Sequence, residues 1–180
     1  MNIKTYIFTL FILFSGFGFC QNKELRSNVI SANFSTTEIG AYQESAEKKI
    51  EDFYSYLNLL SDKTVSEKAK VEIKENIFLL FKDKRVGIID LLYKESSKIS
   101  LSELLDMVEN LTIHFTLIRK KQAQPELYND YWLSEYSVEV ALNEGKFVKK
   151  ISQKIYFSPK NKKFGNAYKE VWEIKLGEIE

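Results

Sequence analysis

The sequence predicts an α+β domain in which two N-terminal helices and a short third helix pack on an antiparallel sheet. Two patterns support this prediction. Apolar side chains recur at helical spacing in the first half of the domain, and they alternate with polar side chains through most of the second half. Runs of helices followed by runs of strands are typical of the α+β class. The sequence contains no internal repeat and no low-complexity tract, and nothing in it indicates a second domain.

The first 20 residues have the pattern of a secretory signal peptide. Lys4 precedes the apolar run at residues 6–14, small residues follow it, and cleavage is expected before Gln21. The run is short for a membrane-spanning helix. The alternative is a lipid anchor on Cys20, which the bulky Phe19 just before it disfavours. The sequence therefore predicts an exported protein, either periplasmic or secreted.

Composition predicts a neutral mature protein without cysteine. Residues 21–40 are expected to form a polar leader and residues 41–180 a single domain with its own core. Cys20 is the only cysteine, so cleavage leaves no disulfide, thiolate metal site or cysteine nucleophile. Cleavage also removes Lys4 from the 26 basic residues, which leaves 25 against 25 acidic ones. A net charge near zero predicts neither nucleic acid nor an anionic membrane as a partner.

The first helix is predicted at residues 41–60. Apolar residues three and four positions apart give it one buried stripe about 100° wide. That stripe contains Ile50, Phe53, Tyr54, Leu57 and Leu60.

The second helix is predicted at residues 65–81, because Thr64 and Glu67 have the spacing of a capping box. Its last turn, residues 78–81, is apolar almost all round and is expected to be the most deeply packed part. The residues expected to face inward are Ala69, Ile73, Ile77, Leu80 and Phe81.

A strand, a short helix and another strand are expected next. Residues 86–93 are rich in β-branched and aromatic side chains, which favours a strand. Ser100 and Glu103 form a second capping box at the start of a helix that ends near Asn110. Apolar and polar residues then alternate through residues 111–120, as in a strand with one buried face.

Residues 131–142 and 146–157 are expected to form a hairpin around a turn at residues 143–145. Their core faces coincide if Leu142 opposes Phe147. This register places Val138 opposite Ile151, Trp132 opposite Phe157 and Tyr136 opposite Gln153. It also pairs Glu139 with Lys150 and Glu135 with Lys154 on the wet face.

A third strand is expected at residues 168–176, after a basic connection at residues 158–166. Two interpretations of this connection stay open. Together with residues 119–121, its lysines Lys160, Lys162 and Lys163 can meet an anionic partner, or they can form a solvated turn that also discourages edge-to-edge aggregation.

In element order and in the aromatic-rich strands YWLSEYSVEV and KEVWEIKL, residues 41–180 resemble the NTF2-like family. The resemblance implies long helices folded over a strongly curved sheet to make a cone. A cystatin-like arrangement, with one long helix on a similar sheet, is the competing fold. The second amphipathic helix favours the NTF2-like one. That family includes isomerases, dehydratases, ligand binders and interaction modules, so the resemblance narrows function little.

Several polar residues occupy the alternate strand positions that face the core, and they are candidates for lining a cavity. Tyr136 is expected to oppose Gln153, with Glu170 within two residues of them. Glu170 is then a candidate acid or base, and Tyr136 a candidate donor to a ligand oxygen. The alternative is that Glu170 lies beside water while Tyr136 and Gln153 bond each other. The full candidate ligand set is Trp132, Ser134, Tyr136, Gln153, Glu170 and Trp172.

His114, the only histidine, is expected to be a half-exposed strand residue, and it is a candidate base only if Asp90 lies on the same wall. The sequence contains no spacing typical of metal ligands, no phosphate loop and no hydrolase motif. No cofactor is expected.

Two hypotheses about function follow. The first is an exported, non-enzymatic module that binds a small apolar molecule or another protein. The second is a small cavity enzyme, isomerase-like, dehydratase-like or hydrolytic, that uses a Glu/Tyr or Asp/His pair.

Overall fold

The computed structural model describes residues 30, 34–93, 97–118, 127–128, 130–143 and 145–180. The predicted signal peptide and Cys20 lie outside these residues, as do residues 119–121 of the predicted basic segment.

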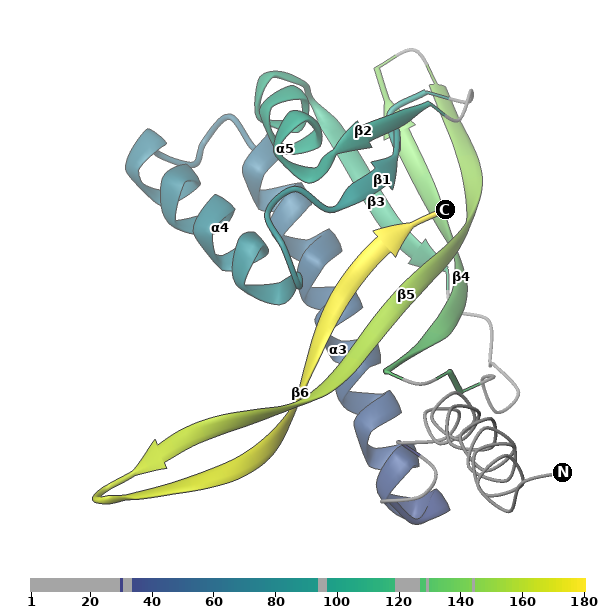
Figure 1. The fold of residues 1–180 in the computed structure, drawn as a ribbon. Helices are drawn as coiled ribbons and strands as arrows, with labels where there is room; N and C mark the ends of the chain where they lie inside the picture. Colours follow the sequence, from purple (N-terminus) through teal and green to yellow (C-terminus); the bar gives the residue numbers. More distant parts are fainter. Residues whose placement is uncertain (1–29, 31–33, 94–96, 119–126, 129, 144) are drawn as a thin grey trace, which may run out of the picture.

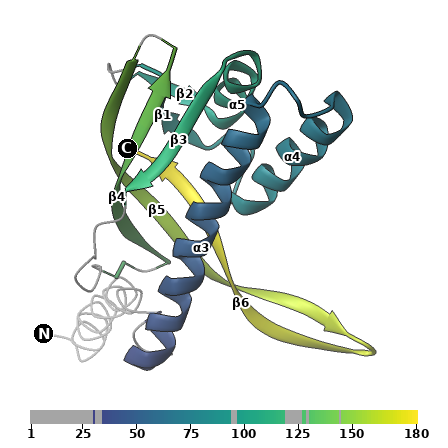
Figure 2. The same ribbon diagram turned by 180° about the vertical axis from the view of Figure 1, so that it is seen from behind.

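Among the described residues, three helices pack on one face of a curved six-stranded sheet (Figures 1 and 2), which confirms the α+β class. The strand order is β2-β1-β6-β5-β4-β3. The prediction of an antiparallel sheet is wrong at one place, because β1 runs parallel to the last strand, with Ile88 opposite Ile179. The helices are α3 (Thr36–Ser61), α4 (Glu67–Leu80) and α5 (Leu101–Asn110). The strands are β1 (Gly87–Ile89), β2 (Lys98–Ser100), β3 (Ile113–Ile118), β4 (Tyr131–Leu142), β5 (Gly145–Phe164) and β6 (Ala167–Ile179).

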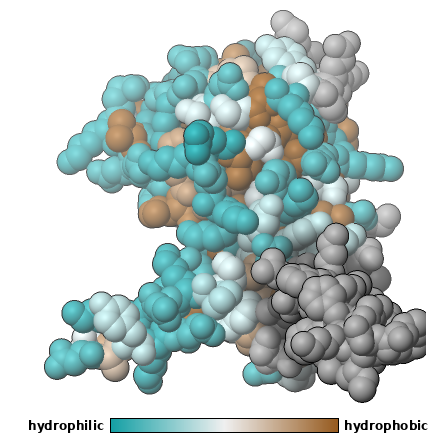
Figure 3. Space-filling model, in the orientation of Figure 1, coloured by the Kyte–Doolittle hydropathy of each residue, from teal (hydrophilic) through white to brown (hydrophobic). Residues whose placement is uncertain are grey.

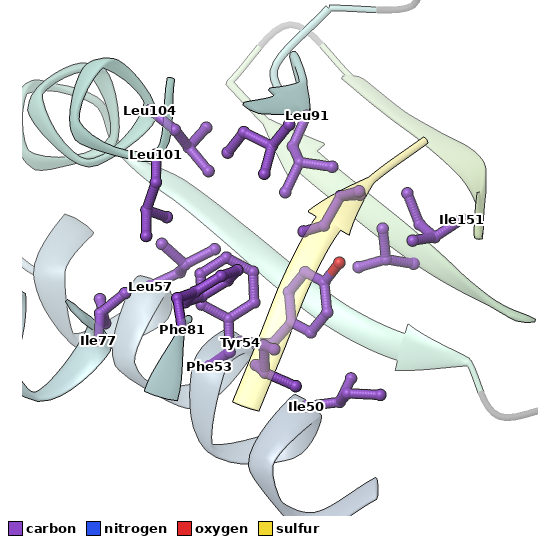
Figure 4. Packing of buried hydrophobic residues seen from close by; sticks show 14 of the residues in the cluster. Ile50, Phe53, Tyr54, Leu57, Ile77, Phe81, Leu91, Leu101, Leu104 and Ile151 are labelled. Carbon is purple, nitrogen blue, oxygen red and sulfur yellow. The ribbon is translucent and has the colours of Figure 1, made fainter. Parts of the chain in front are cut away.

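Helix α3 is the central support of the fold. It begins at Thr36, earlier than expected, because Ser35 and Glu38 form a capping box. The predicted apolar stripe is confirmed, since each of its five residues is at most 3% exposed. Phe53, Tyr54 and Leu57 point from the helix into the core beneath the sheet (Figure 4). None of the helices among the described residues is long and apolar enough to span a bilayer.

Helix α4 is capped by Ser66, the residue before its first turn, whose side chain accepts a hydrogen bond from the Ala69 N–H. The predicted capping box at Thr64 is wrong, because the Thr64 N–H and hydroxyl both donate to Asp62 Oδ1 at 2.8 Å. The C-terminal end is the most deeply packed part, as predicted, since Ile77 and Phe81 are at most 2% exposed, but it is not buried all round. Leu79 is 65% exposed, whereas Phe81, just after the helix, is buried. The apolar ring around this turn is wider than the face that α3 and the sheet cover.

The capping box at α5 is confirmed. Glu103 accepts hydrogen bonds from the Ser100 N–H at 2.7 Å and from its hydroxyl at 2.9 Å. These bonds hold the pKa of Glu103 below its ordinary value of 4.5.

Glu103→Ala is therefore expected to lower the melting temperature at neutral pH. A carboxyl whose pKa is lower in the folded state than in the unfolded state stabilises above the unfolded value, and it loses that effect as the pH falls through the folded value. The difference in melting temperature between Glu103→Ala and the wild type should shrink progressively once the pH drops below 4.5. Thermal melts followed by circular dichroism from pH 7 to pH 3 measure this difference, and a gap that stays constant across the series contradicts the account.

The β4–β5 hairpin forms, but two residues out of the predicted register. The loop is tighter than expected, with Leu142 opposite Gly145, whose φ is +139°. Tyr136 consequently opposes Ile151 rather than Gln153. A shift of two leaves every side chain on its predicted face, so Val138 and Ile151 are both buried.

The predicted wet-face pairs are also wrong. Glu139 opposes Val148, and Glu135 opposes Ser152. Glu139 instead forms an ion pair with Lys146 at 3.1 Å.

The expected basic connection is in fact strand. β5 continues to Phe164, the chain turns at Gly165 (φ +61°), and β6 returns from Ala167. Residues 158–164 and 167–173 form a two-stranded ribbon that projects away from the helices and the rest of the sheet (Figures 1 and 2). We call this segment the β5–β6 ribbon. Every residue from 158 to 170 is exposed.

Candidate functional site

Three polar side chains meet in the core between α3 and the sheet. The hydroxyls of Tyr54 and Tyr136 are 3.2 Å apart, and the Tyr136 hydroxyl donates to Gln153 Oε1 at 2.8 Å. Ser134 is the direct cross-strand neighbour of Gln153 and is also buried. The predicted proximity of Tyr136, Gln153 and Ser134 is therefore confirmed, although the pairing between them differs from the prediction.

The electrostatics of this cluster oppose proton transfer. Burial raises the pKa of Tyr54 and that of Tyr136, so both phenols are neutral and hold their protons at physiological pH. Gln153 is fully buried, and its Nε2 has no hydrogen-bond partner among the described residues. An unpaired buried amide costs about 1–3 kcal/mol. The cluster can donate a hydrogen bond, but it holds no ionised group.

The space expected to be hollow around Tyr136 is occupied by α3. The Tyr54 ring lies edge-on to the Tyr136 ring, with centroids 5.9 Å apart, and only 2% of Tyr54 is exposed. Phe53 and Leu57 pack beside it and are fully buried (Figure 4). These side chains fill the volume in front of Tyr136 that a ligand would need.

The predicted proximity of Glu170 to Tyr136 and Gln153 is wrong, whereas the alternative, with Glu170 beside water and Tyr136 bonded to Gln153, is confirmed. Glu170 opposes Asn161 on the β5–β6 ribbon and is exposed. It lies eight positions along β5 from Gln153, because the ribbon takes up the chain that was expected to form a loop. The proposed pairing of Glu170 with Tyr136 is not assembled.

Trp132 and Trp172 belong to a separate aromatic cluster near the base of the ribbon. The Trp172 ring lies 4.7 Å from the Phe157 ring and 4.9 Å from the Phe34 ring, centroid to centroid. The Phe157 ring also lies 6.1 Å from the Trp132 ring and 4.4 Å from the Tyr42 ring of α3, centroid to centroid. This cluster joins the start of α3 to the sheet through ring contacts, each of which stabilises by about 0.5–1.5 kcal/mol beyond its area.

Asp90 and His114 are not on one wall. His114 is exposed on edge strand β3, opposite Ala141. Asp90 is 5% exposed, and its Oδ1 accepts a hydrogen bond from the Leu92 N–H at 2.8 Å. Asp90 packs beside β5, and two strand spacings, about 10 Å, separate β5 from β3.

The residue that packs beside Asp90 is Lys149, which the sequence analysis overlooked. Lys149 is 6% exposed, and its ammonium group donates to the Asp90 carbonyl oxygen. Burial lowers the pKa of Lys149, and the Asp90 charge partly opposes that effect. The sequence did hold a signal, because Lys149 has the odd parity of the core residues on β5. Its contact ties the segment after β1 to the sheet.

Two adjoining hollows lie at the end of the sheet that carries the β4–β5 turn. The first, of about 490 Å³, is lined mostly by apolar side chains from the segment after β1, the end of α5 and the hairpin. The second, of about 530 Å³, is lined by more polar residues, among them His114, Asn58 and Lys63, although most of its exposed lining is apolar. Thr112, Leu142 and Asn143 line both. The apolar walls of the first hollow are Leu92, Tyr93, Leu111, Leu142 and Phe147.

The first hollow, which we call the apolar hollow, has the size and character of a small-molecule site. Such sites typically measure about 300–1,000 Å³, with apolar walls and a few polar groups. Thr112 and Asn143 supply the polar groups here, and Tyr93 is 61% exposed at its wall. The described residues contain no group of three His, Cys, Asp or Glu side chains placed to share a metal ion.

No family model, no curated protein and no solved structure matches this chain.

Proposed function

We propose that this protein is an exported, non-enzymatic binding module that holds a small apolar molecule in the apolar hollow. The observation that carries the proposal is the lining of that hollow, in which five apolar side chains meet beside two neutral polar ones and one lysine, Lys146. Burial of an apolar ligand there is favourable at about 25 cal/mol per Å². Thr112 and Asn143 are the groups available to orient it.

Binding is favoured over catalysis because neither candidate acid–base pair is assembled. Glu170 lies on the ribbon, and Asp90 is buried away from His114. The Tyr54–Tyr136 pair holds its protons too tightly for acid–base work near neutral pH. The one charged side chain in the apolar hollow, Lys146, is paired with Glu139.

The NTF2-like resemblance supports the type of module proposed, and the signal-peptide pattern supports export. Three helices on a curved sheet are compatible with an NTF2-like cone, whose interior lies between helices and sheet. In this chain the proposed site lies instead at the rim, because Tyr54 fills the interior. The apolar run after Lys4 supports export.

Thermal melts with 1-octanol and with indole test the proposal. A ligand that binds only the folded state at about ten times its Kd stabilises by about 1.4 kcal/mol. For a chain of this size the melting temperature then rises by about 3–6 °C. Leu142→Trp places a large ring in the hollow and is expected to abolish the rise.

The matched control is Val148→Trp, which adds the same ring to an exposed position on β5. This variant should retain the full rise. The proposal is wrong if neither probe raises the melting temperature of the wild type, or if both tryptophan variants respond as the wild type does.

A further inference from the structure

We propose that the β5–β6 ribbon is a membrane-docking arm whose tip inserts into the headgroup region of an anionic bilayer. The ribbon extends the strands beyond the last buried residue of β5, Phe157, to the turn after Phe164. Seven residues at about 3.3 Å each carry the tip about 20 Å from the core. An isolated two-stranded ribbon is only marginally stable in water. A projection of this length therefore contributes little to the stability of the domain.

The tip carries exposed aromatic side chains on both faces of the ribbon. Phe164, opposite Ala167, is 52% exposed, and Tyr168, opposite Lys163, is 70% exposed. Successive cross-strand pairs face opposite sides, so these two rings point to opposite faces. A flat protein partner would contact one face only. End-on insertion into a bilayer buries both.

Lysines form a collar behind the tip, again on both faces. Lys162 and Lys169 oppose each other directly on the Phe164 face, two residues behind that ring, and Lys163 lies on the other face, level with Tyr168. Two residues from the turn correspond to about 7 Å. Aromatic groups of interfacial segments are buried about 5–10 Å deep, so with Phe164 inserted to this depth Lys162 and Lys169 lie at the level of the lipid phosphates.

The Lys162–Lys169 pair shows that the collar is not arranged for the stability of the ribbon. Like charges directly opposite each other destabilise a sheet. Within the described part of the chain, none of the collar lysines forms an ion pair, whereas Lys160, nearer the body, pairs with Glu173 at 3.0 Å. Anionic headgroups would relieve this repulsion.

The balanced net charge of the sequence obscured this feature. Residues 158–173 contain four lysines and two glutamates, and both glutamates lie on the body side of the collar. In the space-filling view the ribbon is hydrophilic along its length, with paler side chains near its end (Figure 3). Folding thus concentrates positive charge at the projecting end of the ribbon, although acidic residues elsewhere in the chain balance that charge overall.

Co-sedimentation of the full chain with phosphatidylcholine vesicles, with and without phosphatidylglycerol, tests the inference. The apolar run at residues 6–14 contributes equally to every variant, so the phosphatidylglycerol-dependent part of binding is compared. We expect the wild type to bind the anionic vesicles more tightly, and added salt to weaken the difference. Lys162→Gln with Lys169→Gln should reduce partitioning by about 30-fold, and Phe164→Ser by about tenfold.

Matched controls lie on the body of the protein. Lys68→Gln with Lys150→Gln removes the same charge from exposed positions, and Val71→Ser removes an apolar side chain that is 64% exposed on α4. Neither control should change binding, and thermal melts verify that every variant is folded. Equal binding to neutral and anionic vesicles, or unchanged binding by the ribbon variants, overturns the inference. An acidic protein segment would then be the partner to seek.

Discussion

Tyr54→Ala is expected to destabilise the protein by about 3–5 kcal/mol, the typical cost of truncating a buried aromatic side chain to alanine. Tyr54 is 2% exposed and contacts the rings of Phe53, Phe115 and Tyr136. Its loss opens a cavity between α3 and the sheet and leaves the Tyr136 hydroxyl with Gln153 as its only hydrogen-bond partner among the described residues. Urea unfolding followed by circular dichroism measures the change in the free energy of unfolding.

Phenol tests whether that cavity exists only in the variant. Engineered apolar cavities bind small aromatic molecules, and the Tyr136 hydroxyl is positioned to bond the phenol hydroxyl. We expect phenol to raise the melting temperature of Tyr54→Ala by more than that of the wild type, which has only the apolar hollow to bind it. Tyr42→Ala, which removes a tyrosine from the aromatic cluster near the ribbon, is the control. An equal response of the wild type and Tyr54→Ala would show that the truncation opens no additional cavity, and it would contradict this expectation.

Asn58→Ala is expected to cost about 1–3 kcal/mol and to promote association of folded molecules. Edge strand β3 has backbone groups that point away from β4. The side chain of Asn58 on α3 satisfies two of them, donating to the Phe115 carbonyl at 2.9 Å and accepting from the Phe115 N–H at 2.7 Å. Ser61 donates to the Ile113 carbonyl at 2.7 Å. The two side chains imitate a neighbouring strand and block the edge.

Urea unfolding and size-exclusion chromatography at increasing concentration measure both effects of Asn58→Ala. Asn110→Ala is the control, because its side chain makes one exposed bond, to the Asp106 carbonyl, and its loss should cost no more than about 0.5 kcal/mol. If Asn58→Ala costs no more than the control and stays monomeric, α3 does not protect this edge.

Periodicity predicted the faces of the elements but not their register. The α3 stripe and the core face of β4 are where the alternation placed them, because burial of one face depends only on residue period. The β4–β5 register depends on the turn, and a loop two residues shorter than expected moved every pair. The same local effect converted the expected loop at residues 158–166 into strand, since a tight turn at Gly165 lets both flanking segments pair.

The candidate site was less predictable, because it depends on where elements cross in space. The alternation along the strands correctly predicted that Tyr136, Gln153 and Ser134 are buried. The same rule applied to Lys149 would have predicted that it is buried too. No periodic pattern shows that Tyr54 of α3 reaches the Tyr136 hydroxyl, or that Asn58 lies against the edge of β3. The apolar hollow is likewise built from segments that are distant in sequence, with Leu92 after β1, Leu111 after α5 and Leu142 at the end of β4.

The most direct test of the binding proposal is a titration of methyl-labelled protein with 1-octanol, followed by nuclear magnetic resonance. The account predicts that the methyl signals of Leu92, Leu111 and Leu142 shift together as the probe enters the apolar hollow. Those of Ile151 and Ile155, which are buried beneath the helices, should stay in place. Shifts that begin at Ile151 and Ile155 would place the ligand between helices and sheet and contradict a binding site at the rim.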